Sequence, residues 1–501
     1  MPPTFDFDFK FQQGFQGRYT FPTGLFINGE FVDSVDKETI DVVNPATGAV
    51  IATVSAGNEK DVDIAVQAAT KAYKSSWGLK VSGLERGKLL FKLADLIERD
   101  VEEISCIEVL NVGKPYLATR HRETIGASNY IRYFAGLAGK LHGKTVEIDE
   151  SIMAYTRYEP LGVVGAIIPW NFPLFLLVWK LAPALAAGNA IIIKPSEITP
   201  LTTLRLCKLF NEAGFPPGVV NVITGTGQAA GAAITKHMGI AKVSFTGSTA
   251  AGRHVMSSAS SSNLKSVSLE LGGKSPSLVF DDADLEQAVR WTAAGIFTNA
   301  GQMCYGGSRI YVQEGIYDKF LESFLAFVQK SKVGDPWDSS TTYGPQVSQA
   351  QMDRVLDYID IGKKEGAVLA RGGFRVGDLG YYIEPTVFTE VKQDMRIMKE
   401  EIFGPVVALA KFKNEEDVLE MANGTMYGLA AAVFTKDVTR AIKMSNELEA
   451  GTVWVNMTLR LQPSMPFGGY KESGIGHDLG EEALRSYYNL KSVHINLGGR
   501  L

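Results

Sequence analysis

Cys304 is the residue of this 501-residue sequence whose type and setting first suggest chemistry. It stands in the run FTNAGQMCYGGSR (residues 297–309), where glycines and polar residues indicate a site with exposed backbone. A thiolate is the strongest nucleophile among protein side chains when its surroundings favour ionisation. The other two cysteines, Cys106 and Cys207, lie inside helical patterns and are predicted to be buried small hydrophobes. Cys304 is therefore the candidate nucleophile.

Glu270 is the candidate general base. It ends an apolar strand in the run SLELGGK (268–274). An acidic side chain among apolar neighbours is costly to bury unless it is paired or functional. A carboxylate in such a place can take a proton from a reacting group. A salt bridge to a lysine is an equally good interpretation of Glu270 taken alone.

Two turns have the features of a nucleotide site. The run FTGSTAAG (245–252) follows an apolar strand, and Ser248 is placed to cap the next helix. The free N–H groups at such a helix start favour an anion such as pyrophosphate, although an ordinary capped helix is the alternative. The run GTGQAAG (225–231) has the spacing GxGxxxG, which is weak evidence for a dinucleotide site and equally describes a strand-to-helix turn.

Lys194 and Glu197 follow the end of another apolar strand in AIIIKPSE. Ligands of open α/β sheets bind beyond the carboxyl ends of the strands. A lysine and a glutamate at this place could hold a ribose, with the carboxylate accepting from its hydroxyls. The alternative, a solvated capping pair, is favoured when these two residues are considered alone.

The elements that would position these residues alternate between short apolar strands and helices after Glu150. Strands are expected at 163–168, 190–193, 219–223, 242–245, 267–270 and 278–280, and helices at 173–187, 199–212, 228–237 and 249–259. A second series begins near Asp284 and continues past Trp454. This alternation predicts two α/β domains with parallel sheets and right-handed crossovers.

Composition excludes several classes of protein. Hydrophobic residues make up 45% and charged residues 21%, as in globular proteins and unlike disordered ones. The net charge of −5, without long blocks of one sign, argues against nucleic-acid binding. None of the six histidines has metal-ligand spacing to another histidine or a cysteine, so no metal is expected. Three cysteines in so long a chain indicate a reducing compartment.

The N-terminal run MPPTFDFDFKFQQGF lacks the features of a secretory or mitochondrial signal, which leaves the cytoplasm as the expected location. It is expected to form either a short strand or a mobile arm anchored by aromatic residues.

The stretch from Leu161 to Trp179 has no charge but is broken by Pro169, Asn171 and Pro173. It is therefore expected to form a strand and a buried helix instead of a membrane span. Asn171 or Phe172 would cap that helix, and Gly188 would end it.

Several of these motifs occur together in one known family. The runs are PWNFP (169–173), KPSE (194–197), FTGS (245–248) with Gly252, LELGGKSP (269–276), GQMC (301–304), EEIFGPV (400–406) and PFGGYKESGIG (466–476). In this set, order and separation, the sequence resembles the NAD(P)-dependent aldehyde dehydrogenase superfamily over nearly its whole length. It is most similar to the general cytosolic and mitochondrial aldehyde dehydrogenases.

The resemblance implies a covalent mechanism. Cys304 would attack the aldehyde carbon, and the Asn171 side-chain amide with the Cys304 backbone N–H would stabilise the oxyanion. Hydride would pass from the thiohemiacetal to the cofactor, and Glu270 would activate the water that hydrolyses the resulting thioester. NAD is the implied cofactor, with NADP as a poorer alternative.

The resemblance also implies the residues that contact the cofactor. Gly247 and Ser248 would meet the pyrophosphate, Lys194 and Glu197 the adenine ribose, and Glu401 with Phe403 the nicotinamide ribose. The loop after Gly225 would lie near the adenine. The complete implied set is Ile168, Pro169, Trp170, Lys194, Ser196, Glu197, Gly227, Gly231, Phe245, Gly247, Ser248, Leu271, Glu401 and Phe403.

Three structural parts follow from the same resemblance. A cofactor-binding domain would comprise residues 1–139 and 160–272, a catalytic domain 273–480, and an oligomerisation ribbon 140–159 with 481–501. The strand-like tail from Ser486 has no partner near it in sequence and would join the neighbouring ribbon across a dimer interface. The protein is expected to be a homo-oligomer, either a dimer or a tetramer.

A substrate tunnel is implied by alignment to the family. Its expected lining is Phe172, Leu176, Trp179, Thr298, Met303, Leu459, Leu461 and Phe467. This wall is apolar and lacks a fixed charge, so a neutral aliphatic or aromatic aldehyde is the expected substrate, with broad specificity. The pair His477-Asp478 departs from the family, with no consequence that the sequence reveals.

Three other functions compete with this one. A cofactor-free cysteine hydrolase would have no use for the Gly247 loop, and a CoA-acylating relative would typically lack the Glu270 equivalent. A non-catalytic structural protein should have lost Cys304 or Glu270. The sequence argues against all three.

Overall fold

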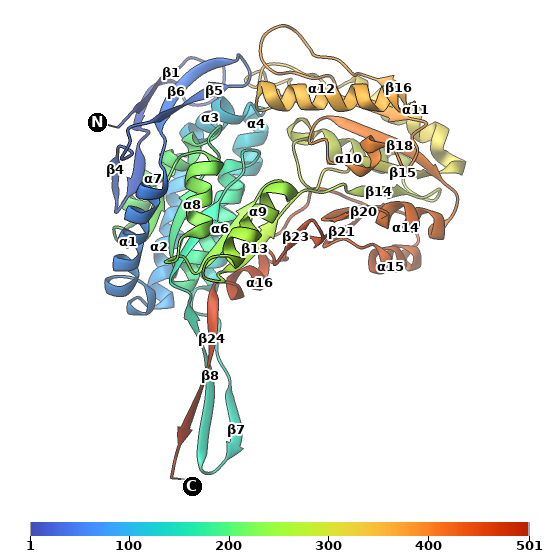
Figure 1. Cartoon of the computed structure of the whole chain (residues 1–501). Helices are drawn as coiled ribbons and strands as arrows, with labels where there is room; N and C mark the ends of the chain where they lie inside the picture. The colour runs from blue at the N-terminus through green and yellow to red at the C-terminus, as the bar shows by residue number, and fades with distance from the viewer. Residues whose placement is uncertain (1, 499–501) are drawn as a thin grey trace.

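Two parallel sheets, each covered by helices, and a projecting ribbon make up the chain (Figure 1). The computed structural model describes residues 2–498. The first sheet lies in the blue-to-green half of Figure 1 and the second in the yellow-to-red half. This arrangement confirms the predicted fold class of two doubly wound α/β units with a small β ribbon.

The first sheet has eight strands in the order β23-β13-β12-β9-β10-β11-β3-β4. Its parallel strands are β9 (Val163–Ile167), β10 (Ala190–Lys194), β11 (Val220–Val222), β12 (Lys242–Thr246) and β13 (Ser266–Glu270). Three short antiparallel strands complete it, namely β3 (Leu25–Ile27), β4 (Glu30–Val32) and β23 (Gly474–Ile475). The chain order reverses between β9 and β12, which is where ligands bind in sheets of this kind.

Helices connect the parallel strands of the first sheet as the sequence predicts. They are α6 (Pro173–Ala187), α7 (Leu201–Ala213), α8 (Ala232–Lys236) after a π-helical turn at Gly227–Gly231, and α9 (Thr249–Ser260). Helix α6 starts with Pro173 after Phe172 as N-cap, and Gly188 ends it in the left-handed conformation at φ 95°. No helix of residues 2–498 is long and apolar enough to span a membrane.

Further helices come from the N-terminal part of the chain and pack beside this sheet. They are α1 (Glu59–Ser75), α2 (Gly83–Arg99), α3 (Val101–Val112) and α5 (Ile125–Leu137). A short helix, α4 (Tyr116–Ala118), and a π-helical segment, η2 (Thr119–Thr124), connect α3 to α5.

The second sheet has seven strands in the order β16-β17-β18-β15-β14-β20-β21. They are β14 (Pro276–Val279), β15 (Arg309–Gln313), β16 (Val368–Arg371), β17 (Thr386–Thr389), β18 (Val406–Phe412), β20 (Ala430–Phe434) and β21 (Thr452–Val455). All neighbouring strands are parallel except the edge strand β16. Its main helices are α10 (Leu285–Phe297), α11 (Tyr317–Gln329), α12 (Gln349–Lys364), α14 (Glu415–Asn423) and α15 (Val438–Glu447).

The ribbon contains β7 (Thr145–Asp149), β8 (Ile152–Pro160) and the C-terminal β24 (Tyr488–Asn496). Strand β24 pairs antiparallel with β8 of the same chain, from Tyr488 opposite Pro160 to Asn496 opposite Ile152. The tail therefore has a partner within its own chain, which the sequence did not reveal, and its contact with a neighbouring subunit's ribbon stays a prediction. Its partner lies over 300 residues away in the sequence, and local patterning could not identify it.

The N-terminal segment is a strand, which decides between the two alternatives left open. Strand β1 (Thr4–Phe9) pairs with β2 (Gly17–Pro22), and its alternation buries Phe5 and Phe9 while the aspartates face outward. Farther along, the Phe11 ring stacks on Trp337 with centroids 3.9 Å apart. This contact attaches the N-terminal hairpin to a segment that follows helix α11.

We predict that Phe9→Ala lowers the free energy of unfolding by about 3–5 kcal/mol, because truncating a buried aromatic leaves a cavity. Phe9 is 1% exposed, whereas Phe7 on the same strand is only partly buried and serves as the control. Urea unfolding of Phe9→Ala and Phe7→Ala measures the difference. Equal shifts in the two variants would show that the hairpin does not pack as described.

Candidate functional site

The site lies where the carboxyl end of the first sheet meets the amino end of the second. Glu270 is the last residue of β13, and Cys304 lies in the loop that leads into β15. Gly272 and Gly273 link the two sheets. A Cβ at Gly273 would lie 2.2 Å from the Cys304 carbonyl oxygen, and one at Gly272 would lie 2.5 Å from a Glu401 carboxylate oxygen. The contact at Gly273 is with backbone and requires glycine, since real Cβ contacts are not this short, whereas the Glu401 side chain beside Gly272 can move.

The loop before Cys304 has an unusual backbone. Asn299 and Ala300 adopt φ of 52°, and Gly301 adopts φ of 73°. The buried side chain of Gln302 fixes the loop, because its Nε2 donates to the Asn299 carbonyl (3.0 Å) and its Oε1 accepts from the Val347 N–H (2.8 Å). Left-handed conformations in residues other than glycine are costly and are concentrated at functional sites.

The thiol of Cys304 lies in a region with little access to water. Burial raises its pKa well above the ordinary value, and the nearby carboxyl groups of Glu401 and Glu270 raise it further. The resting side chain is therefore a protonated thiol. Any reaction at its sulfur needs a nearby group that accepts the proton.

Glu270 is 3% exposed, and neither carboxylate oxygen has a hydrogen-bond partner among the described residues. Burial raises its pKa well above the ordinary value, the charge of Asp478 raises it further, and Lys180 opposes both. A buried carboxyl that lacks hydrogen bonds is costly, so it indicates a functional group instead of a structural one. The alternative considered from sequence, a salt bridge from Glu270 to a lysine, is absent within residues 2–498.

Two residues near Glu270, Lys180 and Asp478, were not recognised from the sequence as parts of the site. Lys180 Nζ forms an ion pair with Asp478 Oδ2 at 2.8 Å, and both side chains are buried. Lys180 is the only charged residue of the apolar helix α6, a signal that the sequence contained. The departure noted at Asp478 thus has a structural consequence, because it supplies the partner of a buried lysine beside the candidate base.

Asn171 faces the Cys304 loop from the start of α6. Its Nδ2 donates to the Gln302 carbonyl at 3.0 Å, and the Asn299 side chain donates to the Asn171 carbonyl at 3.2 Å. These bonds fix the orientation of the amide. The second N–H of this amide has no hydrogen-bond partner among residues 2–498.

A cavity of about 570 Å³ connects these groups. Cys304, Glu270 and Asn171 line it, together with six of the residues expected in the tunnel, which are Phe172, Leu176, Trp179, Leu459, Leu461 and Phe467. Thr298 and Met303 are not part of this lining, because Thr298 begins the kinked turn before the loop and Met303 is buried at 3% exposure.

The expectation of an uncharged wall is wrong. The cavity lining also contains His121, Arg122, Arg460 and Asp478. The two arginines come from segments whose backbone geometry the sequence does not reveal. One lies in the π-helical segment η2, and the other follows Leu459, which adopts φ of 62°.

The residues implied for the cofactor meet at the carboxyl edge of the first sheet. Lys194 Nζ bonds to Glu197 Oε2 at 2.8 Å, and the Gly227 N–H donates to the other oxygen of Glu197 at 3.4 Å. Burial alone would raise the pKa of Glu197, but the Lys194 ammonium and backbone N–H groups outweigh it and hold this pKa below its usual value. The Glu197 carboxylate therefore stays charged and able to accept hydrogen bonds.

The start of α9 lies at the same edge, because it follows β12. Ser248 caps the helix by accepting from the Ala251 N–H at 3.2 Å, as the sequence predicts. Phe245 is the penultimate residue of β12, and its ring occupies the space where Gly247 would carry a Cβ. Leu271 occupies the corresponding space at Gly252, with a Cβ-to-Cδ2 separation of 2.6 Å. Gly247 is half-buried and Ser248 is exposed, so the helix start is open to a ligand.

The remaining implied residues surround the passage between the sheets. Trp170 and Phe403 pack edge to face with centroids 5.1 Å apart, and Glu401 accepts from the Gly273 N–H at 3.0 Å. Burial raises the pKa of Glu401 to about 7. The Ile168 N–H donates to the Lys194 carbonyl, Gly231 lies against the Lys194 side chain, and Pro169 and Ser196 occupy the adjoining loops.

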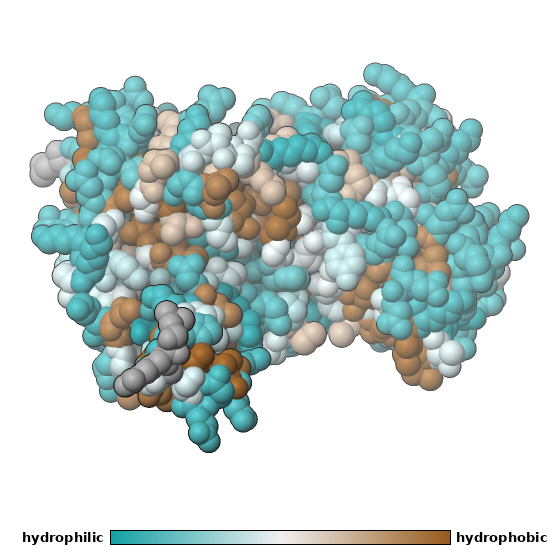
Figure 2. All heavy atoms as spheres, turned by 60° about the horizontal axis from the view of Figure 1, so that its bottom comes forward, coloured by the Kyte–Doolittle hydropathy of each residue, from teal (hydrophilic) through white to brown (hydrophobic). Residues whose placement is uncertain are grey.

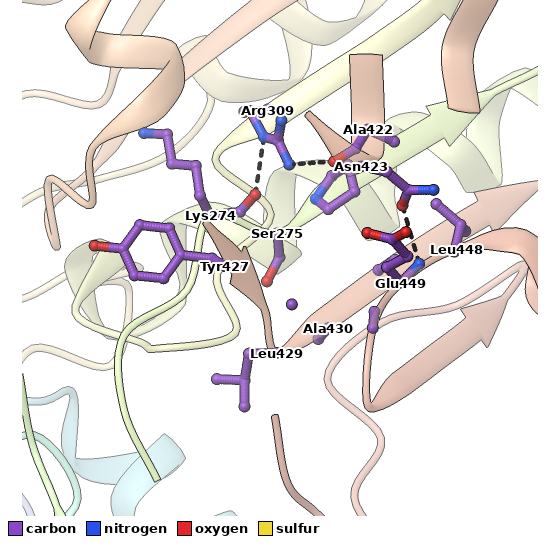
Figure 3. Close-up of a pocket in the computed structure, with 14 residues that line it drawn as sticks. Lys274, Ser275, Arg309, Ala422, Asn423, Tyr427, Leu429, Ala430, Leu448 and Glu449 are labelled. Carbon is purple, nitrogen blue, oxygen red and sulfur yellow. Dashed lines mark hydrogen bonds between the residues drawn. The ribbon is translucent and has the colours of Figure 1, made fainter. Parts of the chain in front are cut away.

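A second, much smaller cavity lies behind the LELGGKSP motif (Figure 3). Arg309 crosses beside it, donating to the Lys274 carbonyl at 2.8 Å and the Ala422 carbonyl at 2.9 Å. This small cavity has a volume of about 10 Å³ and holds no more than about one water molecule. This region therefore supports the backbone of the Glu270 loop and is not a ligand site. Burial also lowers the pKa of Lys274 to about 7.

Metal ligation receives no support from the geometry. Among the residues that the structure describes, no group of three or more His, Cys, Asp or Glu side chains could hold a metal ion.

Comparison with known proteins identifies the family of the chain. The model of the aldehyde dehydrogenase family matches residues 31–493. The chain belongs to the aldehyde dehydrogenase family. It is 54% identical to an aldehyde dehydrogenase of Agaricus bisporus over 97% of each protein, and 50% identical to aldehyde dehydrogenase 1A1 of Mesocricetus auratus over 95% of each.

Solved structures of aldehyde dehydrogenases share its fold. The NAD+ complex of the Bacillus cereus enzyme is 46% identical with a TM-score of 0.94, covering 95% of this chain and 97% of that one. A betaine aldehyde dehydrogenase of Staphylococcus aureus in complex with NAD+ is 41% identical, with a TM-score of 0.94 and 96% coverage of both chains.

We predict that Gly273→Ala lowers kcat for aldehyde oxidation by about 100-fold, because an added methyl group must displace the Cys304 backbone. Gly315→Ala is the control, since a Cβ there meets no atom within 4 Å. Steady-state kinetics and thermal unfolding of both variants separate a local displacement from global destabilisation. Normal turnover in Gly273→Ala would contradict the close approach on which the site depends.

Proposed function

We propose that this protein catalyses the NAD-dependent oxidation of an aldehyde to a carboxylic acid through a thiohemiacetal and a thioester on Cys304. The observation that supports it is that the partly buried Cys304 thiol and the buried Glu270 carboxyl line one cavity, at the junction of two sheets. NAD is proposed as the cofactor because solved relatives over 40% identical are NAD+ complexes.

The first step is attack of the Cys304 sulfur on the aldehyde carbon. The thiol proton passes to Glu270, whose raised pKa suits it to accept a proton in this dry environment. The oxyanion that forms accepts hydrogen bonds from the Asn171 amide and the Cys304 N–H. Glu270 thus has a role before deacylation, because the burial that raises the pKa of Cys304 prevents spontaneous ionisation.

NAD, when bound, supplies the acceptor for the hydride that leaves the thiohemiacetal carbon. The carbon–oxygen double bond then re-forms, and Cys304 carries a thioester. Glu270 releases to solvent the proton that it took from the thiol, and its carboxylate then takes a proton from water as the water oxygen adds to this thioester. The carbon–sulfur bond breaks, the carboxylic acid leaves, and the sulfur is reprotonated.

The carboxyl edge of the first sheet is the proposed NAD site. The capped start of α9 would bind the pyrophosphate, and the Lys194–Glu197 pair would bind the adenine ribose. Glu401 and Phe403 would contact the other ribose. The charged Glu197 carboxylate favours a free 2′-hydroxyl over a 2′-phosphate, so NADP is proposed as the poorer cofactor.

We also propose the domain division of the sequence analysis and a homo-oligomeric state. Apolar residues on the ribbon are exposed, among them Val146, Ile148, Met153 and Leu490. Figure 2, in which the bottom of Figure 1 faces forward, shows apolar residues gathered around this part of the molecule. Such exposure on a three-stranded ribbon supports association between subunits. Three free cysteines support a reducing compartment, proposed as the cytoplasm.

We predict that Cys304→Ala abolishes aldehyde oxidation while NAD still binds, because only the covalent step is lost. Cys106→Ala and Cys207→Ala are the controls, since both thiols are buried away from the cavity. Aldehyde turnover is followed by absorbance of the reduced cofactor, and NAD binding by calorimetry. Retained turnover in Cys304→Ala would exclude the mechanism.

We predict that Glu270→Gln forms the thioester slowly and then stalls, because glutamine keeps the shape of the side chain but cannot take a proton from the Cys304 thiol or from water. A rapid-mixing trace should show at most one equivalent of reduced cofactor per site, and mass spectrometry should detect acyl-enzyme. A slower first turnover would support proton transfer from Cys304 to Glu270 as well.

The pH dependence provides a second test of Glu270. Its raised pKa means that the carboxyl is protonated and inactive as a base at low pH, so wild-type turnover should rise as pH increases through that pKa. The Glu270→Gln variant should lack this rise. Undiminished steady-state turnover in the variant would remove Glu270 from the catalytic set.

A further inference from the structure

The exposed end of the main cavity is polar and cationic. Its exposed lining residues, here called the cavity mouth, are His121, Arg122, Asn129, Arg460 and Gln462. The opposite end holds the buried residues Asn171 and Glu270 near Cys304. A molecule bound to Cys304 by its aldehyde carbon would therefore extend from a dry apolar tunnel toward positive charge.

Arg122 lies on a segment whose backbone is held in place by buried ion pairs. It lies in the π-helical segment η2, a geometry that is rare and is often found at functional sites. The next residue, Glu123, is buried and bonded to Lys114, which also pairs with Glu108 at 3.3 Å. This buried network fixes the segment, while the Arg122 guanidinium has no hydrogen bond or ion pair within residues 2–498.

Arg460 lies at the same cavity mouth but comes from the loop after β21, far from Arg122 in the sequence. The Trp454 indole donates to the Arg460 carbonyl at 2.9 Å, and the Tyr130 hydroxyl donates to the Leu461 carbonyl at 3.2 Å, so the loop backbone is fixed. The Arg460 guanidinium lies over the Trp291 ring, 5.7 Å from its centroid. Trp291 also lines the cavity, and in the described part of the chain no carboxylate pairs with Arg460.

No acidic side chain of the lining compensates these charges at the mouth. The two acidic lining residues, Glu270 and Asp478, are both buried, and Asp478 already pairs with Lys180. An unpaired cation on a surface of a protein with net charge −5 indicates a ligand of opposite charge. Two arginines on rigid segments at one opening strengthen that indication, because guanidinium groups suit carboxylates and phosphates.

We propose that the cavity mouth selects aldehydes that carry an anionic group, a carboxylate or a phosphate, at the end opposite the aldehyde. This inference rests on the proposed aldehyde oxidation, because the orientation of the substrate follows from binding of its aldehyde carbon to Cys304. The apolar tunnel between Cys304 and the mouth implies a hydrocarbon spacer between the two groups. The substrate is thus an amphipathic molecule with a charged tail.

The test uses the full-length enzyme with NAD and a homologous series of straight-chain aldehydes. Each member ends in a carboxylate and is paired with its neutral methyl ester, and a phosphate-ended series distinguishes the two kinds of anion. We expect kcat/KM to favour the carboxylate or phosphate over the ester once the chain is long enough to reach the mouth. The preference should appear in KM more than in kcat, and added salt should reduce it.

Arg122→Gln and Arg460→Gln should each lower the ratio of kcat/KM for anion over ester by about fivefold, the size expected of one partly solvated ion pair. Arg122→Glu should reverse the preference. Arg485→Gln is the matched control, since Arg485 is exposed, pairs with Glu481 and lies outside the cavity lining. The control should keep the wild-type ratio.

Binding to the inactive Cys304→Ala variant separates this inference from the proposed function. Straight-chain carboxylic acids and the matching amides are titrated against tryptophan fluorescence, because Trp179 and Trp291 line the cavity. Tighter binding of the acids, lost in the Arg122→Gln background, supports the inference even if no aldehyde is oxidised. Equal kcat/KM and equal Kd for anionic and neutral partners at every length overturn it, as does a ratio that neither arginine substitution changes.

Discussion

The close approach of backbone at Gly272 and Gly273 is the constraint on which the site depends. The space that a side chain would need at these positions contains Glu401 on one side and the Cys304 carbonyl on the other. Because packed interiors transmit small displacements, one added methyl group here would separate the end of β13 from the loop before β15. The two sheets therefore share a site only because the chain crosses between them without side chains.

That junction brings ionisable groups into a dry region, and burial then determines their proton affinity. Glu270 and Cys304 both hold their protons more tightly than in water. The buried Lys180–Asp478 pair adds opposing effects on Glu270, since the aspartate raises its pKa and the lysine lowers it. A buried ion pair is poor evidence of stability, so its presence beside the base is better explained by its effect on that base.

Local patterns in the sequence predicted the structural features, such as helix ends and caps, that depend on residues close together in the chain. Helix α6 begins at Pro173 and ends before Gly188 as expected, and Ser248 caps α9, because capping residues act within one turn. What the sequence could not predict depends on distant partners. Asp478 meets Lys180 across 298 residues, and β24 pairs with β8 across a similar distance. Family resemblance, rather than periodicity, is the basis for the proposed cofactor residues.

The cavity places a dry region for the reaction and a solvated region for a charged ligand group at opposite ends. The proposed covalent chemistry at Cys304 would take place beside buried residues, where a charged group of the ligand is costly to place. A charged group can instead be bound where solvent still reaches it, provided that the cations there are held by rigid backbone. Segment η2 and the loop around Leu459 provide that support without contributing to the reacting centre. Because the mouth lies on these segments and the chemistry lies between the sheets, substitutions at Arg122 or Arg460 can change the preferred substrate while leaving the geometry of the Gly272–Gly273 junction intact.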